Sequence, residues 1–138
     1  ADAALNPNNY PSMPLAMATA VAAMAGNAWP LLASFVGGLG AFITGSNTVS
    51  DMLFGEFQWG VAEHLNMPRQ IIVAAQAVGG AMGNMVCIHN IVAACAVTGL
   101  VGAEGMILKR TFWPFLLYGV VVGIIASLMC FVFLPHLF

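Results

Sequence analysis

Charged residues are scarce in this sequence, and their scarcity excludes a large class of proteins. Only 6% of the 138 residues are charged, whereas about a quarter are charged in an ordinary soluble domain. A chain with so little charge cannot cover a water-facing surface, so we exclude a soluble domain. The three cations and the formal net charge of −2 also give binding to nucleic acid no electrostatic basis.

Motifs for catalysis and for metal binding are missing as well. The three cysteines, Cys87, Cys95 and Cys130, lie in apolar runs without a CxxC or Cys/His spacing. We interpret them as free thiols that pack as small apolar side chains. The sequence has no Ser/His/Asp order and no phosphate-binding glycine loop followed by lysine. It therefore predicts neither an enzyme nor a cofactor or metal site.

Long uncharged stretches make up most of what is present. Residues 3–50, 70–103 and 111–138 contain no Asp, Glu, Lys or Arg, and 61% of the whole chain is hydrophobic. Each stretch exceeds the roughly 20 apolar residues that cross a bilayer as a helix. We predict a single all-α integral membrane domain over residues 1–138, a helical bundle that is a fragment of a larger protein.

The first half of the chain predicts a helix followed by a hairpin. Residues 1–13 are polar and indicate a loop, whereas residues 14–27 are rich in Ala and Met and indicate a helix. Residues 29–65 form two short apolar arms around a polar turn at residues 45–48. This pattern predicts a re-entrant hairpin, which persists at membrane depth only when it is buried in protein or lines an aqueous cavity.

Residues 69–102 predict a transmembrane helix with a break. A straight helix of this length would extend about 50 Å, against a hydrocarbon core of about 30 Å. Its middle contains several glycines together with Asn84, His89 and Asn90. These residues disfavour a continuous lipid-facing helix, so we expect two half-helices joined by a polar link.

A charged loop and a last helix complete the chain. Residues 112–134 predict an uninterrupted transmembrane helix, with Pro114 tolerated in its first turn. Lys109 and Arg110 outnumber Arg69, which favours a cytoplasmic side for the loop at 103–111. Arg69, the open end of the hairpin and the C-terminus are then expected on the opposite side.

The polar turn Ser46-Asn47-Thr48, called the hairpin tip below, is the first candidate binding site. Free N–H groups and the positive dipole end of the following helix attract an anion. The hydroxyl and amide groups add neutral donors, and their oxygens could hold a cation. The alternative is a plain helix N-cap by Ser46 or Thr48. Inside a membrane, polar backbone of this kind favours a binding role.

Further candidates are polar or ionisable groups within apolar runs. Asn84, His89 and Asn90 surround the expected helix break, and intramembrane polar groups are costly, so we expect a role in substrate binding or coupling. A carboxylate at the bilayer centre costs about 2.5–3.5 kcal/mol, so Asp51 and Glu56 must each be protonated, paired or near water. Asp51, His89 and Glu56 are the candidates for proton coupling. Asp51 could instead complement the helix dipole, and Glu56 could extend to the interface.

At these residues the sequence resembles the C-terminal region of the L-lactate permease family. The resemblance extends from about Pro14 to Leu134. It is strongest in four motifs: TGSNTVS at 44–50, VGGAMGNM at 78–85, IHNIVAA at 88–94 and VTGLVGAEG at 97–105. The family consists of multi-span inner-membrane symporters, grouped with ion transporters in which a Ser-Asn-Thr hairpin tip contacts carboxylate and cation.

The resemblance implies a function and a site. The expected function is proton-coupled uptake of lactate, or of a related monocarboxylate such as glycolate, across the bacterial inner membrane. The hairpin tip would form half of the substrate site, and the upstream part of the same permease would supply the rest, so this chain should not transport alone. Glu56 departs from the small or apolar residue expected at its position. Alternatives are another carboxylate with a different coupling ion, or a channel or non-transporting membrane subunit.

Overall fold

The computed structural model describes residues 13–133. Over this range the chain is helical and contains no strand. Its elements are α1 (Met13–Ala25), a 3-10 turn (Gly26–Ala28), α2 (Trp29–Thr44), α3 (Asn47–His64), α4 (Arg69–Gly83), α5 (Ile88–Thr98), α6 (Glu104–Leu128) and a closing π-helical turn (Met129–Phe133). Of the loop expected at residues 1–13, residues 1–12 lie outside the described residues and Met13 begins α1.

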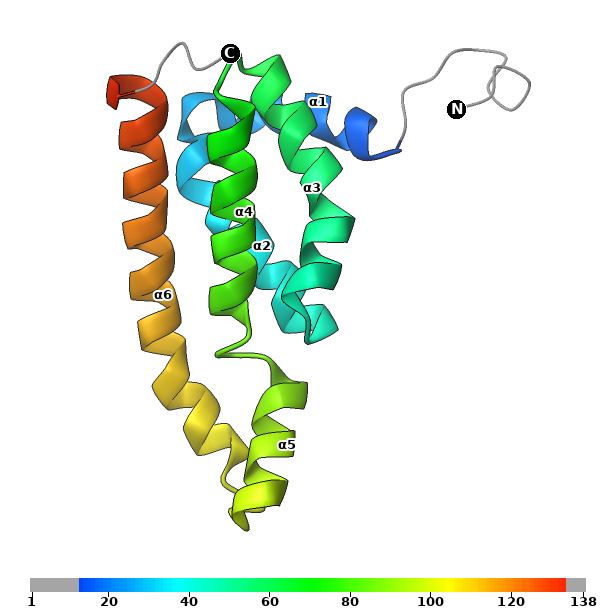
Figure 1. Ribbon diagram of the computed structural model, residues 1–138, viewed down its shortest axis with the longest axis vertical. Helices are drawn as coiled ribbons and strands as arrows, with labels where there is room; N and C mark the ends of the chain where they lie inside the picture. Colours follow the sequence, from blue (N-terminus) through cyan, green and yellow to red (C-terminus); the bar gives the residue numbers. More distant parts are fainter. Residues whose placement is uncertain (1–12, 134–138) are drawn as a thin grey trace, which may run out of the picture.

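The predicted all-α membrane fold is confirmed. Within residues 13–133, three helical runs are long and apolar enough to cross a bilayer: Ala16–Thr44, Arg69–Thr98 and Glu104–Phe133. The first of them is not straight, because Gly26 takes a positive φ of 49° between α1 and α2. Figure 1 shows α1 lying across one end of the bundle, at a steep angle to the helices that follow it.

Helices α2 and α3 form a tight helical hairpin. α2 ends at Gly45, whose φ of 75° is left-handed and whose N–H bonds to the Ala41 carbonyl. A side chain would be strained in that conformation, so glycine allows the chain to reverse here. The two arms extend from the turn to the same end of the bundle (Figure 1), in the arrangement expected for residues 29–65.

Glycines let α4 pack closely against the hairpin. A Cβ added to Gly79 would collide with the Ser34 backbone, and one added to Gly83 would collide with the Gly38 backbone. From the other side, a Cβ on Gly37 would collide with the Gln76 carbonyl. Small residues permit such close backbone approach between membrane helices. α2 and α4 therefore form a seam of backbone against backbone.

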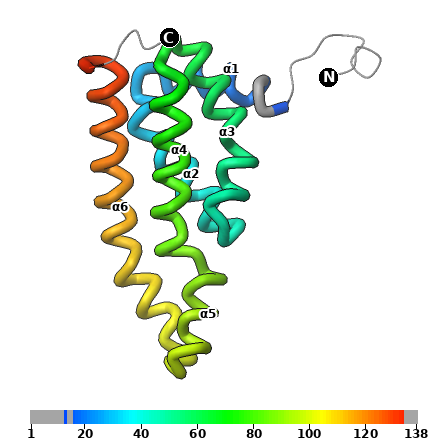
Figure 2. Tube along the Cα trace, in the orientation of Figure 1, coloured from blue at the N-terminus to red at the C-terminus, as the bar shows by residue number. Residues whose placement is uncertain are grey.

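The long apolar run from Arg69 to Thr98 is broken, as the sequence indicates. α4 ends at Gly83 and α5 begins at Ile88, which leaves residues 84–87 as a non-helical link. Figure 2 shows the trace stepping sideways at this link before α5 continues toward the α5–α6 turn. We call residues 84–87, with His89 and Asn90 at the start of α5, the helix break.

The last helix differs from its expected bounds. α6 begins at Glu104 rather than at residue 112, because the Glu104 carboxylate accepts a hydrogen bond from Gly102 N–H at 3.1 Å and starts the helix there. Pro114 consequently lies inside α6 and not in its first turn. Proline removes one helical hydrogen bond and bends a helix, and the α6 axis changes direction along its first half (Figure 1).

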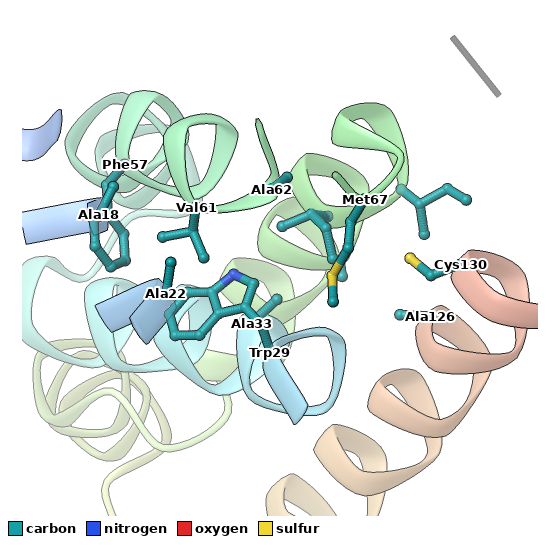
Figure 3. Packing of buried hydrophobic residues seen from close by; sticks show 13 residues of the cluster. Ala18, Ala22, Trp29, Ala33, Phe57, Val61, Ala62, Met67, Ala126 and Cys130 are labelled. Atoms are coloured by element: carbon teal, nitrogen blue, oxygen red, sulfur yellow. The ribbon is translucent and has the colours of Figure 1, made fainter. Parts of the chain in front are cut away.

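The hydrophobic core lies at the open end of the hairpin. Trp29 and Phe57 meet edge to face at 5.6 Å between ring centroids, and Ala126 and Cys130 of the last helical segment join the same cluster. Figure 3 shows Trp29 within this group, among residues of several helices. The hairpin tip lies at the other end of α2 from Trp29.

Candidate functional site

The hairpin tip opens α3 with a capped first turn. Ser46 has an extended backbone, and its Oγ accepts a hydrogen bond from Val49 N–H at 3.3 Å. The N-cap interpretation of Ser46 is therefore correct. The cap leaves the N–H groups of Asn47 and Thr48 in the first turn, where a helix offers them no carbonyl partner. Capping and anion binding are compatible at this helix end.

The structure brings the turn at Gly45, directly before the hairpin tip, against the helix break, and the tip residue Asn47 against the end of α4 that leads into the break. A Cβ added to Gly45 would lie 3.5 Å from Cys87 Sγ and 3.6 Å from His89 Nδ1. About one turn before the end of α4, a Cβ on Gly80 would overlap Asn47 Oδ1. Two segments about forty residues apart in the chain thus share one polar junction. The contact depends on glycine on both sides.

Amide groups span the helix break itself. Asn90 Nδ2 donates to Asn84 Oδ1 at 3.2 Å, so the first turn of α5 is joined to the first residue of the link. Cys87 Sγ and His89 Nδ1 are 3.7 Å apart. His89 and Asn90 are exposed, as is Thr48 of the tip. The junction therefore has polar groups that open outward from the described part of the chain.

The two membrane carboxylates have different surroundings. Asp51 is partly buried and lies near the Gln76 side chain of α4, whose amide donates to the neighbouring Ser50. Its Oδ1 atom is buried without a partner, and so is Asn47 Oδ1, within the described residues. Glu56 lies on an exposed part of α3. Asp51, the carboxylate nearer the hairpin tip, is therefore the one that faces α4.

A buried ladder of amides joins the helices behind the tip, and the sequence analysis missed it. Trp29 Nε1 donates to Gln58 Oε1 at 2.9 Å, and Gln58 Nε2 donates to Gln76 Oε1 at 2.9 Å. Gln76 Nε2 donates to Ser50 Oγ at 3.1 Å, and that hydroxyl donates to the Gly37 carbonyl at 2.8 Å. Glutamines within apolar runs were the available signal, because buried amides need partners.

One large groove among the described residues is a separate feature. It has a volume of about 830 Å³, lies between α2 and α6, and is lined by apolar and aromatic residues with Lys109. None of the candidate binding residues lines it. An apolar groove cannot replace the hydration of a carboxylate, so it does not compete with the polar junction as an anion site.

Fold and site together define a class of protein. The chain is part of a multi-pass helical membrane protein whose polar residues meet where a hairpin tip touches a broken helix. Such junctions inside a membrane are typical of transporters that bind small ions or substrates. The described residues contain no group of His, Cys, Asp and Glu side chains that could hold a metal ion.

Comparison with known proteins identifies the family. Residues 5–133 match the family model described as L-lactate permease, and the chain belongs to that family. It is similar to a putative L-lactate permease of Haemophilus influenzae, with 44% identity over 103 residues that cover 75% of this chain and 19% of the relative.

Two relatives from Escherichia coli (strain K12) match more of the chain. Glycolate permease GlcA is 38% identical and an L-lactate permease is 35% identical, each over 125 residues that cover 91% of this chain and 22% of the relative. The chain thus spans about a fifth of the length of these relatives. No solved structure matches it.

Proposed function

We propose that this chain is the C-terminal part of a secondary transporter for a small monocarboxylate, lactate or glycolate, in the bacterial inner membrane. The family and the names of its relatives support the substrate class. The observation that carries the proposal is the contact between the hairpin tip and the helix break, which gathers polar groups inside an apolar bundle.

The hairpin tip provides donors for a carboxylate. The first-turn N–H groups of α3 and the positive end of its dipole favour an anion. The Thr48 hydroxyl is exposed, and the Asn47 amide can donate through Nδ2. Asn84, His89 and Asn90 on the facing break would contact the substrate from the other side. This is half a site, and the upstream part of the permease would supply the other half.

A coupling proton completes the proposed mechanism. Titratable groups near the junction are Asp51 on α3 and His89 on α5. Glu56 is the weaker candidate because it lies on the exposed part of α3, beyond the junction. Substrate and proton would bind together, and a movement of one helix bundle against another would expose them to the opposite side.

Alanine substitutions at the hairpin tip test the substrate site in the full-length permease. A hydrogen bond to a charged partner contributes about 1.5–3 kcal/mol, so Asn47→Ala and Thr48→Ala should each raise the half-saturation concentration for lactate by about ten- to a hundredfold. Uptake is measured over a range of lactate concentrations and normalised to the permease in the membrane.

Thr98→Ala is the matched control. Thr98 is exposed, and its hydroxyl bonds only within its own helix, to the Ala94 and Cys95 carbonyls. This variant should keep the wild-type half-saturation concentration. Unchanged half-saturation and maximal rate in both tip variants would refute the tip as the substrate site.

A further inference from the structure

Two buried oxygens at the hairpin tip and in the first turns of α3 lack a hydrogen-bond donor. Asn47 Oδ1 and Asp51 Oδ1 have no hydrogen-bond partner among the described residues. The two residues are four apart on α3 and therefore lie on one face of the helix. Leaving a buried acceptor without a hydrogen-bond donor is energetically costly. Two acceptors on one face attract a proton or a cation and repel an anion.

The amide ladder gives the neighbouring Gln76 one orientation. The Trp29 indole can only donate, so the Gln58 oxygen must face it and the Gln58 NH₂ group must face α4. That NH₂ group donates to the Gln76 oxygen, which turns the Gln76 NH₂ group toward Ser50 and Asp51. The Trp29 indole at one end of the ladder thus orients the Gln76 NH₂ group toward the Asp51 carboxylate at the other end.

Few charged groups surround Asp51. Among the described residues, α1 and α2 carry no Asp, Glu, Lys, Arg or His side chain. The charged residue of α4 is Arg69, at the opposite end of that helix, where it pairs with Glu63 at 3.1 Å. The other ionisable residues of α3 are Glu56, Glu63 and His64. His89 of the helix break approaches the tip at Gly45.

The donor set favours a proton over a metal cation. Hard cations such as Ca²⁺ take six to eight oxygen ligands, whereas two unpaired side-chain oxygens lie here. A proton needs less: one carboxylate to carry it and one oxygen to accept the resulting O–H. Asp51 and Asn47 supply these two parts.

We propose that Asp51 carries the coupling proton, that its O–H then donates to Asn47 Oδ1, and that Gln76 is the positioning residue that holds the carboxylate. The proton binds from water on one side of the membrane and returns to water on the other, without any other bond changing. The proposal deepens the proposed function and rests on it. The Asn47 amide would join both ligands, with Oδ1 toward the proton and Nδ2 toward the substrate carboxylate.

Asp51→Asn in the full-length permease, reconstituted in proteoliposomes, tests the proton site. Asparagine imitates the neutral carboxyl group, so lactate exchange between the two sides should continue. Accumulation driven by a pH gradient should disappear. If accumulation persists, or if a sodium gradient and not a pH gradient drives it in the wild type, the proposal is wrong. If the wild type exchanges neither lactate nor glycolate, the proposed function itself fails.

Gln76→Met tests the positioning role through the pH profile. The Gln76 donor stabilises the charged carboxylate, so its loss lets Asp51 bind a proton at higher pH. The pH of half-maximal uptake should rise by about one unit, and Trp29→Phe, which frees the ladder to reorient, should shift it in the same direction. Gln70→Met, at an exposed position of the same helix, should leave the profile unchanged.

A purely structural role for the ladder gives a different result. Gln76→Met and Trp29→Phe would then lower the amount of permease in the membrane and leave the pH profile of the remaining protein at the wild-type position. That outcome, measured together with lactate exchange to show that the remaining protein is folded, would overturn the assignment of Gln76.

Discussion

The site depends on Gly80 because this residue has no side chain. The Asn47 side chain occupies the space that a Cβ on Gly80 would take. Asn47 can lie against α4 only because that space is open. At the scale of the residue, the junction is therefore specified by a glycine as much as by the polar groups that face it.

Gly80→Ala should disturb transport more than folding. The new methyl group would displace the Asn47 amide from α4, so lactate uptake per permease molecule should fall at least tenfold, the cost of about one hydrogen bond to a charged partner. Gly55→Ala is the control, because a Cβ there meets nothing within 4 Å and alanine favours the helix by about 1 kcal/mol. Equal uptake by both variants would contradict the role of this contact.

Individual polar residues were predictable from the sequence, but their partners were not. Asn47, Asp51 and His89 stand out because polar groups are costly in an apolar run. Gln58 and Gln76 stand in similar runs, yet their importance comes from a hydrogen bond between two helices. Pairing of this kind depends on the rotation of each helix about its axis, which composition and spacing do not determine.

At the scale of the element, glycine and length predicted the helices better than charge did. The break in the run from Arg69 to Thr98 follows from its excess length and its central polar residues, and the structure has it at residues 84–87. The start of α6 was misplaced because Glu104, Lys109 and Arg110 suggested a loop. An acidic residue in the first turn of a helix instead complements its dipole, and Glu104 takes that place.

The orientation of the elements in the membrane is a separate prediction. α6, which has Lys109 and Arg110 near its start, begins at the end of the bundle where it meets α5, whereas α4, whose first residue is Arg69, begins at the opposite end (Figure 1). In a full-length permease without other cysteines, Ala103→Cys should resist an impermeant thiol reagent added outside intact cells. Gln70→Cys, at the start of α4, should react. Labelling of Ala103→Cys alone would reverse the orientation.

At the scale of the whole molecule, the apolar core and the polar junction lie at different positions along the length of the helical bundle. The cluster around Trp29 and Phe57 closes the open end of the hairpin, while the tip meets the helix break nearer the middle of the bundle (Figure 1). The all-α membrane fold class followed from the sequence. The meeting of tip and break follows from the packing of α4 against the hairpin.

Residues 1–138 alone should not accumulate lactate. The chain spans about a fifth of its relatives' length, and half a binding site cannot alternate between two sides. Co-expression with the remaining upstream part of the permease as a separate chain should restore uptake above the level of either part. Uptake by residues 1–138 alone, in cells lacking other lactate transporters, would contradict this division of the site.

The glycine seam between α2 and α4 also limits how the molecule can deform. Sliding one helix along the other would bring side chains into positions where a Cβ already collides with backbone. The seam therefore resists sliding of α2 along α4, and the hairpin and α4 should move together as one rigid body. We expect the hinge of this rigid body at residues 84–87, whose backbone is outside any helix. Asn84 would then both contact the substrate and lie within the hinge.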